Sequence, residues 1–201
     1  EMLRRLVGSE MCIRDRGKVE EVCYLCYPIL IHGYMPRIKD GFKGERAIVL
    51  PAFLIEELKQ DPLGSELYIT DIGYYPHAYF HYRKRDTEEV TEFILIYCME
   101  GEGWFELDKH QYAVTANQFF ILPEHQAHAY GSNEKNPWTI YWIHFNGTKA
   151  AFFSAGFDRP KSITPQEDSR IKERLVLFEE IYSSISSGSV SYTHLTLPTI
   201  A

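Results

Sequence analysis

The sequence of 201 residues has few cysteines, no long apolar run and no excess of positive charge. Four cysteines in a chain of this length do not predict a disulfide framework. The apolar runs are short, as between Ile48 and Ile55, and therefore predict no helix that crosses a membrane. Because a signal-peptide pattern is also missing, we expect a cytoplasmic protein.

The charge balance argues against one large class of partner. Acidic residues outnumber basic residues by 28 to 21, which gives a net charge of −7. A surface that binds duplex DNA must neutralise phosphates with lysine and arginine, so most of this chain does not fit that task. With 45% hydrophobic and 14% aromatic residues, the chain is instead expected to fold as a globular domain.

The two ends of the chain can be encoded by one DNA word that is read in opposite directions. A codon choice for Met11–Arg16 has a reverse complement that encodes Val190–His194. The word resembles the mosaic end of transposase-based sequencing libraries. We therefore expect residues 1–16 and 189–201 to be translated adapter sequence without a role in the fold.

The native sequence is expected to lie between these two arms. Met35 is the candidate initiator, in which case residues 17–34 are upstream sequence; the alternative, that they belong to the protein, stays open. They hold a C-x-x-C pattern, Cys23 and Cys26, which lacks the second ligand pair of a structural zinc site. We expect the gene to continue beyond Gly188.

Short strands dominate the pattern in the middle of the chain. Most end at a glycine, proline or asparagine turn, and the strands between Phe93 and Leu122 follow one another closely. The expected strands are Glu66–Asp71, Phe93–Met99, Trp104–Leu107, Gln111–Val114, Asn117–Leu122 and Trp138–Phe145. This series predicts a mainly β protein with an antiparallel barrel or jelly roll.

The segment before residue 188 predicts a helix. Apolar residues recur there at spacings of 4, 3, 4 and 3, which places them on one stripe of a helix. The stripe consists of Ile171, Leu175, Phe178, Tyr182 and Ile185. Thr164 and Glu167, around Pro165, have the pattern of a capping box at the helix start. Two interpretations stay open, because the stripe can pack on its own barrel or against the same helix of a second subunit.

The histidines do not form a metal-binding pattern. A metalloenzyme built on a small β-barrel needs two histidines that flank one residue, a glutamate on the same strand and a third histidine after a turn. His77 and His81 are four apart, and His125 and His128 three apart, but there is no His-x-His. Motifs of serine hydrolases, phosphate-binding loops and dinucleotide-binding turns are also missing. We therefore expect neither a metal nor another cofactor.

Aromatic and polar side chains are concentrated on the expected strands. Alternation along Trp138–Phe145 places Ile140, Trp142 and His144 on one face and other large residues on the opposite face. This strand is therefore expected to be covered on both sides. A barrel mouth lined by tryptophan, tyrosine, histidine and arginine suits a sugar, because rings stack on its apolar face while polar tips bind its hydroxyls. The plainer interpretation is that the aromatic residues fill the core.

Four segments carry a resemblance to a known family. They read LYITDIGYYPHAYFHYRKR from residue 67, FILIYCMEGEGWFEL from 93, NQFFILPEHQAHAYG from 117 and NPWTIYWIHFNG from 136. This part of the chain resembles the N-terminal effector-binding and dimerisation domain of AraC-type transcriptional regulators. The resemblance implies a small antiparallel cupin-like barrel at 35–160, a helical dimerisation or linker segment at 161–188, and a helix-turn-helix region that this chain lacks.

We therefore expect the ligand-sensing and dimerisation domain of an AraC-type regulator. It would form a homodimer, bind a sugar or related small molecule without a metal, and reach DNA only through the missing C-terminal region. The side chains expected to bind the ligand are Arg83, Trp104, His128, Tyr130, Trp142 and His144. The alternative is a cupin-like enzyme, such as an isomerase, that acts on a sugar or a small acid.

Overall fold

The structure is a computed structural model that describes residues 36–164 and 170–187. The two adapter-like arms, the C-x-x-C pattern, Met35 and residues 165–169 of the expected capping box lie outside the described residues. Within the described ranges, no helix is long and apolar enough to cross a membrane.

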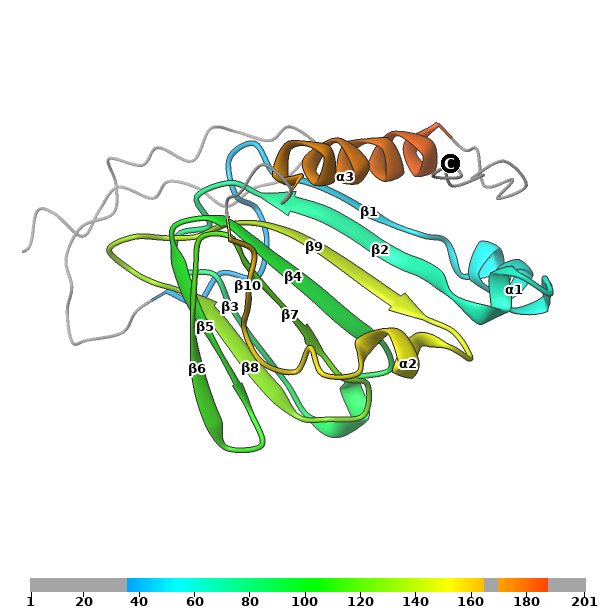
Figure 1. Ribbon diagram of the computed structural model, residues 1–201, viewed down its shortest axis with the longest axis horizontal. Coiled ribbons are helices and arrows are strands. Elements are labelled where there is room, and N and C mark those ends of the chain that lie inside the picture. The colour runs from blue at the N-terminus through cyan, green and yellow to red at the C-terminus, as the bar shows by residue number, and fades with distance from the viewer. Residues whose placement is uncertain (1–35, 165–169, 188–201) are drawn as a thin grey trace, which may run out of the picture. The chain divides into compact units, whose positions relative to one another are not determined.

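The described residues form two antiparallel β-sheets and three α-helices (Figure 1). The strands are β1 (Arg46–Val49), β2 (Tyr68–Tyr75), β3 (Tyr82–Arg85), β4 (Phe93–Glu100), β5 (Glu102–Leu107), β6 (His110–Thr115), β7 (Gln118–Leu122), β8 (His128–Ser132), β9 (Thr139–Asn146) and β10 (Lys161–Ser162). The helices are α1 (Ala52–Gln60), α2 (Ala150–Ser154) and α3 (Ile171–Ser186), and single 3-10 turns lie at Gly64–Glu66 and Thr87–Glu89.

The two sheets pack face to face with the core between them. The larger sheet has the order β1-β2-β9-β4-β7-β10, and the smaller sheet has the order β3-β8-β5-β6. All the pairings between these strands are antiparallel. This arrangement confirms the prediction of a mainly β protein with an antiparallel barrel followed by a C-terminal helix.

Aromatic rings join the two sheets at one end of the barrel. Phe105 on β5 stacks on Phe120 on β7 with ring centroids 4.0 Å apart, and both side chains are fully buried. Trp138, at the start of β9, is also fully buried, and its indole N–H donates a hydrogen bond to Nδ1 of His81 at 3.2 Å. Gly103 leaves room for this ring, because a Cβ atom there would overlap the indole.

The expected strand at Phe93–Met99 is β4, the central apolar strand of the larger sheet. Its residues are buried on both faces, as a continuous apolar run predicts. The strand ends at Gly101, whose φ of +74° lies in the left-handed region that favours glycine. A side chain at this position would also overlap the backbone of Pro137. The turn therefore fixes the hairpin from β4 to β5.

Helix α3 packs on the outer face of the larger sheet. Phe178 stacks on the Tyr141 ring with centroids 4.8 Å apart, and Arg46 forms two hydrogen bonds to Glu179 at 2.6 and 2.8 Å. The Ile185 side chain packs with a small apolar cluster beneath the helix end. Members of the expected stripe thus contact their own barrel, which favours the first of the two interpretations of this helix.

Six elements were not predicted from the sequence: strands β1, β3, β8 and β10 and helices α1 and α2. The apolar run from Ile48 to Ile55 divides at Pro51 into the end of β1 and the start of α1. Proline has no N–H for a sheet, and its fixed φ suits a helix start, so it separates the two elements. Helix α2 and strand β10 are too short to leave a periodic pattern.

Candidate functional site

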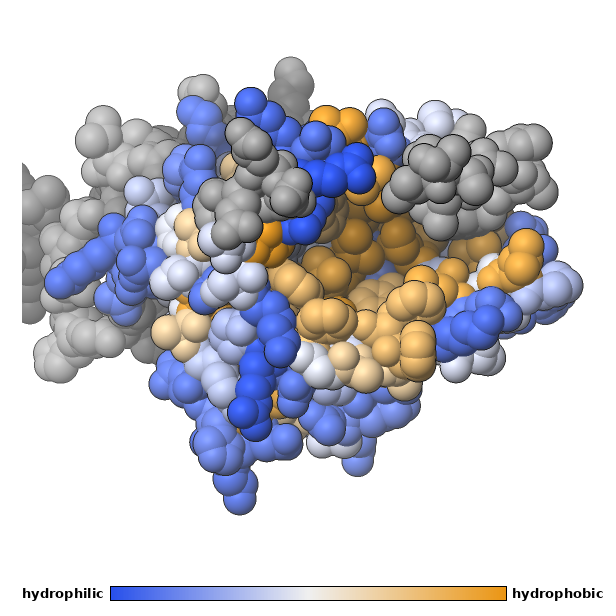
Figure 2. Space-filling model, viewed as in Figure 1, coloured by the Kyte–Doolittle hydropathy of each residue, from blue (hydrophilic) through white to orange (hydrophobic). Residues whose placement is uncertain are grey.

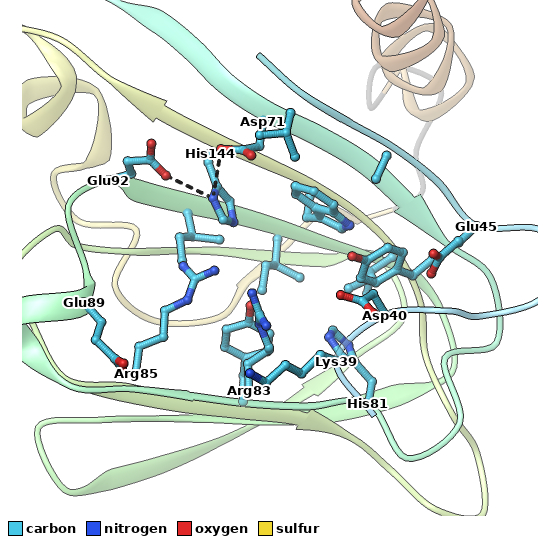
Figure 3. A pocket seen from close by; sticks show the side chains of 18 residues that line it. Lys39, Asp40, Glu45, Asp71, His81, Arg83, Arg85, Glu89, Glu92 and His144 are labelled. Carbon is cyan, nitrogen blue, oxygen red and sulfur yellow. Dashed lines mark hydrogen bonds and ion pairs between the residues drawn. The ribbon is translucent and has the colours of Figure 1, made fainter. Parts of the chain in front are cut away.

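A cavity of about 500 Å³ lies between the two sheets. Its walls come from β2, β4 and β9 of the larger sheet, β3 and β8 of the smaller sheet, and β1 with the segment before it (Figure 3). The volume is in the range of small-molecule sites. Pairing within the two sheets sets the direction in which the inward side chains project.

Four of the six side chains expected to bind a ligand line this cavity. Tyr130 projects from β8, Trp142 and His144 from β9, and Arg83 from β3. The expected alternation along β9 is confirmed, because Ile140 also lines the cavity while the opposite face of the strand meets α3 and a second hollow. The structure therefore brings these four residues together from three strands.

Trp104 and His128 lie outside the cavity lining. On β5 the inward position belongs to the fully buried Phe105, so Trp104 faces outward, where its ring packs near Tyr82 at 6.1 Å. His128 shares the inward face of β8 with Tyr130 but lies two residues away, and its ring stacks on Tyr130 at 5.9 Å. His128 can therefore support the Tyr130 ring without contacting a molecule in the cavity.

His144 forms the centre of a polar cluster in the cavity wall. Its Nδ1 lies 3.2 Å from a Glu92 oxygen and 3.4 Å from an Asp71 oxygen, and Thr70 donates a hydrogen bond to Asp71 at 2.7 Å. Because carboxylates only accept, Nδ1 carries the proton. Burial acts to raise the pKa of Asp71, but the hydrogen bonds from His144 and Thr70 outweigh it, and the pKa lies below its ordinary value.

This cluster also has the donor set of a cation site. Ligand atoms of Asp71, Glu92 and His144 all lie within 4.8 Å of one another. One imidazole and two carboxylates can coordinate a divalent transition metal. Sequence reasoning found His144 alone, because Asp71 reaches it only through the pairing of β2 with β9, in which the two residues are register partners.

Aromatic rings form the other end of the cavity. The Tyr75 ring packs edge-on against Trp142 and against His81, in both cases with centroids 5.3 Å apart. Burial lowers the pKa of His81 to about 3, and Trp138 donates to its Nδ1, so the neutral ring carries its proton on Nε2. Gly73 gives the Trp142 ring its place, because a Cβ atom at this position would overlap the indole.

A second hollow, of about 580 Å³, lies between α3 and the outer face of the larger sheet. Figure 2 shows hydrophobic residues gathered there. Leu95, Tyr97 and Ile143 line it from the sheet, and Leu177 and Ile181 from the helix. This hollow is largely apolar, whereas the cavity between the sheets carries most of the charged side chains.

A barrel with a ligand-sized polar and aromatic cavity defines a small-molecule-binding domain. The family described as AraC-like ligand binding domain matches residues 72–195, and the chain belongs to this family. The description of the family as a ligand-binding domain agrees with the ligand-sized cavity between the two sheets.

Two curated relatives are regulators of bacterial operons. The chain is 36% identical over 114 residues to the MmsAB operon regulatory protein of Pseudomonas aeruginosa, an alignment that covers 54% of this chain and 36% of the relative. It is 27% identical over 128 residues to the lactose operon transcription activator of Staphylococcus xylosus, which covers 63% of this chain and 42% of that protein. The chain thus spans well under half the length of these relatives.

Several solved structures are similar to parts of the chain. The protein YhaK from Escherichia coli is 12% identical and has a TM-score of 0.37, over 53% of this chain and 46% of that one. A Cupin 2 conserved barrel domain protein from Leptotrichia buccalis is 10% identical with a TM-score of 0.35, over 65% of this chain and 50% of that one.

Proposed function

We propose that this domain senses a sugar or related small molecule in the cavity between the two sheets. The single observation that carries the proposal is the composition of that cavity: Tyr75, Tyr130 and Trp142 offer ring faces, while Arg83 and His144 offer polar groups. Rings against apolar C–H faces and polar tips against hydroxyls are the usual means of binding a sugar. The name of the Staphylococcus xylosus relative, a lactose operon activator, supports the same class of effector.

The effector is proposed to control transcription through a part of the regulator outside this chain. The net charge of −7 does not suit contacts with DNA phosphates, so DNA binding is assigned to a separate C-terminal region. The barrel at 35–160 would hold the ligand, and the segment at 161–188 would contribute to a homodimer. The regulator would act in the cytoplasm, and its domain would bind ligand without catalysing a reaction.

The test is a thermal-shift screen of the 201-residue chain against sugars, polyols and sugar acids, in the presence of a chelator. A ligand at a hundredfold excess over its Kd should stabilise the domain by about 2.7 kcal/mol. Trp142→Ala should abolish the shift. Trp104→Ala removes a tryptophan side chain that lies outside the cavity, and this variant should still show the thermal shift. The proposal fails if no compound shifts the midpoint, or if the shift survives Trp142→Ala.

The cluster of Asp71, Glu92 and His144 favours a second candidate, a cupin-like enzyme acting on a sugar or a small acid. These residues would hold a divalent cation, which supplies Lewis-acid chemistry when bound. Titration of chelator-treated protein with Mn²⁺ or Zn²⁺ separates the two candidates. Metal binding that His144→Ala abolishes, together with ligand shifts seen only when metal is present, would favour the enzyme.

A further inference from the structure

We propose that the effector is a hydroxylated carboxylic acid, such as a sugar acid, whose carboxylate lies between Arg83 and Arg85. The inference rests on the proposed function and narrows its ligand from sugars in general to acids. Both arginines line the cavity from β3, and Figure 3 shows both side chains extending into it. Lys84, between them in the sequence, is exposed. Residues two apart on a strand share a face at about 7 Å, a separation that two guanidinium groups can bridge around one anion.

Both guanidinium groups lack an anionic partner among the described residues. The ion pairs of the described ranges include neither Arg83 nor Arg85. Arginine stays charged at all physiological pH values and presents a planar fork that matches a carboxylate. Placing two such charges in a partly enclosed cavity is unfavourable until a counter-ion binds.

Five carboxylates line the same cavity, and four of them, Glu45, Asp71, Glu89 and Glu92, accept hydrogen bonds within the described residues. Asp71 and Glu92 share the Nδ1 proton of His144, and Thr70 also donates to Asp71. The Glu45 carboxylate accepts backbone N–H groups of the neighbouring turn at 2.7 and 2.8 Å. These four acidic side chains thus have hydrogen-bond donors of their own, and none of the five carboxylates, Asp40 included, forms an ion pair with Arg83 or Arg85 among the described residues.

The electrostatic effect of the arginines is visible in their neighbours. Burial is the main cause that lowers the pKa of His81, and the charge of Arg83 lowers it further. Burial also lowers the pKa of His128 to about 4, and Arg85 adds to this effect. The charge of Arg85 also helps to lower the pKa of Asp71. The positive charge of the two arginines thus acts on groups on several sides of the cavity.

The opposite wall of the cavity, which carries Asp71 and Glu92, can bind the hydroxyl groups of the ligand. Each carboxylate oxygen has two lone pairs, so Asp71 and Glu92 can accept further hydrogen bonds from hydroxyls while keeping the contact to His144. A ligand with an acidic end and a hydroxylated end satisfies both walls of the cavity. A neutral sugar satisfies only the carboxylate wall and leaves the guanidinium groups without a counter-ion.

The experiment compares acids with their neutral counterparts on the 201-residue chain by calorimetry. The pairs are D-galacturonate with D-galactose and D-gluconate with D-sorbitol, and D-glucose 6-phosphate serves as the phosphate-bearing arm. We expect at least one carboxylic acid to bind tenfold or more tightly than its neutral partner. Arg83→Gln and Arg85→Gln should each weaken binding of that acid at least tenfold, whereas Lys84→Gln, which removes an adjacent charge, should change it less than twofold.

Folding of each variant is checked by near-ultraviolet circular dichroism. Arg83→Lys keeps the positive charge but lacks the planar guanidinium group. This variant should therefore weaken binding of the acid less than Arg83→Gln does. The inference is overturned if neutral sugars bind as tightly as acids, if only the phosphate ester binds, or if Lys84→Gln causes the same loss. Binding of neutral sugars alone would leave the proposed function standing, whereas no binding by any of these compounds would contradict both.

Discussion

His81 and His128 are buried imidazoles whose protonation opposes the folded state. Only 3% and 4% of their surfaces are exposed. Burial lowers the pKa of His81 to about 3 and that of His128 to about 4, from an ordinary value of 6.5. The unfolded chain therefore binds protons below about pH 6.5 that the folded chain still excludes.

Stability is accordingly expected to decrease as the pH falls below about 6.5. The contribution of each histidine is fully present above that pH and is lost down to about pH 4 for His128 and about pH 3 for His81. Each can cost up to about 1.4 kcal/mol per pH unit. Thermal melts between pH 7.5 and 5 should show the fall, and His128→Gln should make it shallower. His110→Gln, at an exposed position, is the control; an unchanged midpoint over this range would contradict the prediction.

A single aromatic side chain also shows a limit of sequence reasoning. Trp104 and Phe105 are adjacent large rings on one strand, and alternation requires that one faces inward and the other outward. Both rings suit a core, so the sequence does not determine which of them faces inward. Arg85 could have been predicted from the sequence, because it shares a strand face with Arg83. The proximity of Asp71 to His144 could not have been predicted, because it depends on the register between β2 and β9.

At the scale of elements, α3 contacts the barrel through an aromatic stack, an ion pair and the side chain of Ile185. Phe178 stacks on Tyr141 at 4.8 Å and lies parallel to Tyr97 at 6.4 Å. The Arg46–Glu179 pair is about 40% exposed on each side, so solvent screens its contribution. The apolar contact is therefore expected to decide whether the helix stays docked.

Phe178→Ala should destabilise the domain by about 1–2 kcal/mol and should speed hydrogen exchange of the α3 amides. Val176→Ala is the matched control, because Val176 lies on the same helix with 54% of its surface exposed. Exchange and chemical denaturation can be measured on the same samples. Equal effects of the two substitutions would mean that α3 is not docked through this face.

The strands that were predicted clearly are those whose two faces are both buried. The continuous apolar run of β4 and the alternation of β9 are set by the two covered faces of the larger sheet, and both patterns were clear in the sequence. Strand β1 was missed because it has four residues and its cavity side, Ala47 and Val49, is exposed. A strand of four residues with one exposed face has little apolar pattern to detect.

For the whole molecule, the two terminal arms are expected to add nothing to stability. Deleting residues 1–16 and 189–201 should leave the thermal midpoint within about 2 °C if these residues are encoded by adapter DNA, because such residues would not be selected to pack. The family match extends to residue 195, so the C-terminal deletion is the more informative of the two. A loss of several degrees from either deletion, equivalent to about 1 kcal/mol or more, would count against the adapter interpretation. Deleting 171–188 instead removes the docked helix and should lower the midpoint.

Strand β1 gives the cavity and the helix a common boundary. Ala47 and Val49 line the cavity, while Arg46, next in sequence, binds Glu179 of α3. The strand lies at the edge of the larger sheet and pairs along one side only, with β2. Because these residues share one short strand, a displacement of β1 would move the cavity lining and the ion-pair partner of α3 together. Thermodynamic reciprocity then applies. If docking of α3 raises the affinity for an effector by some factor, a bound effector raises the equilibrium constant for docking of α3 by the same factor.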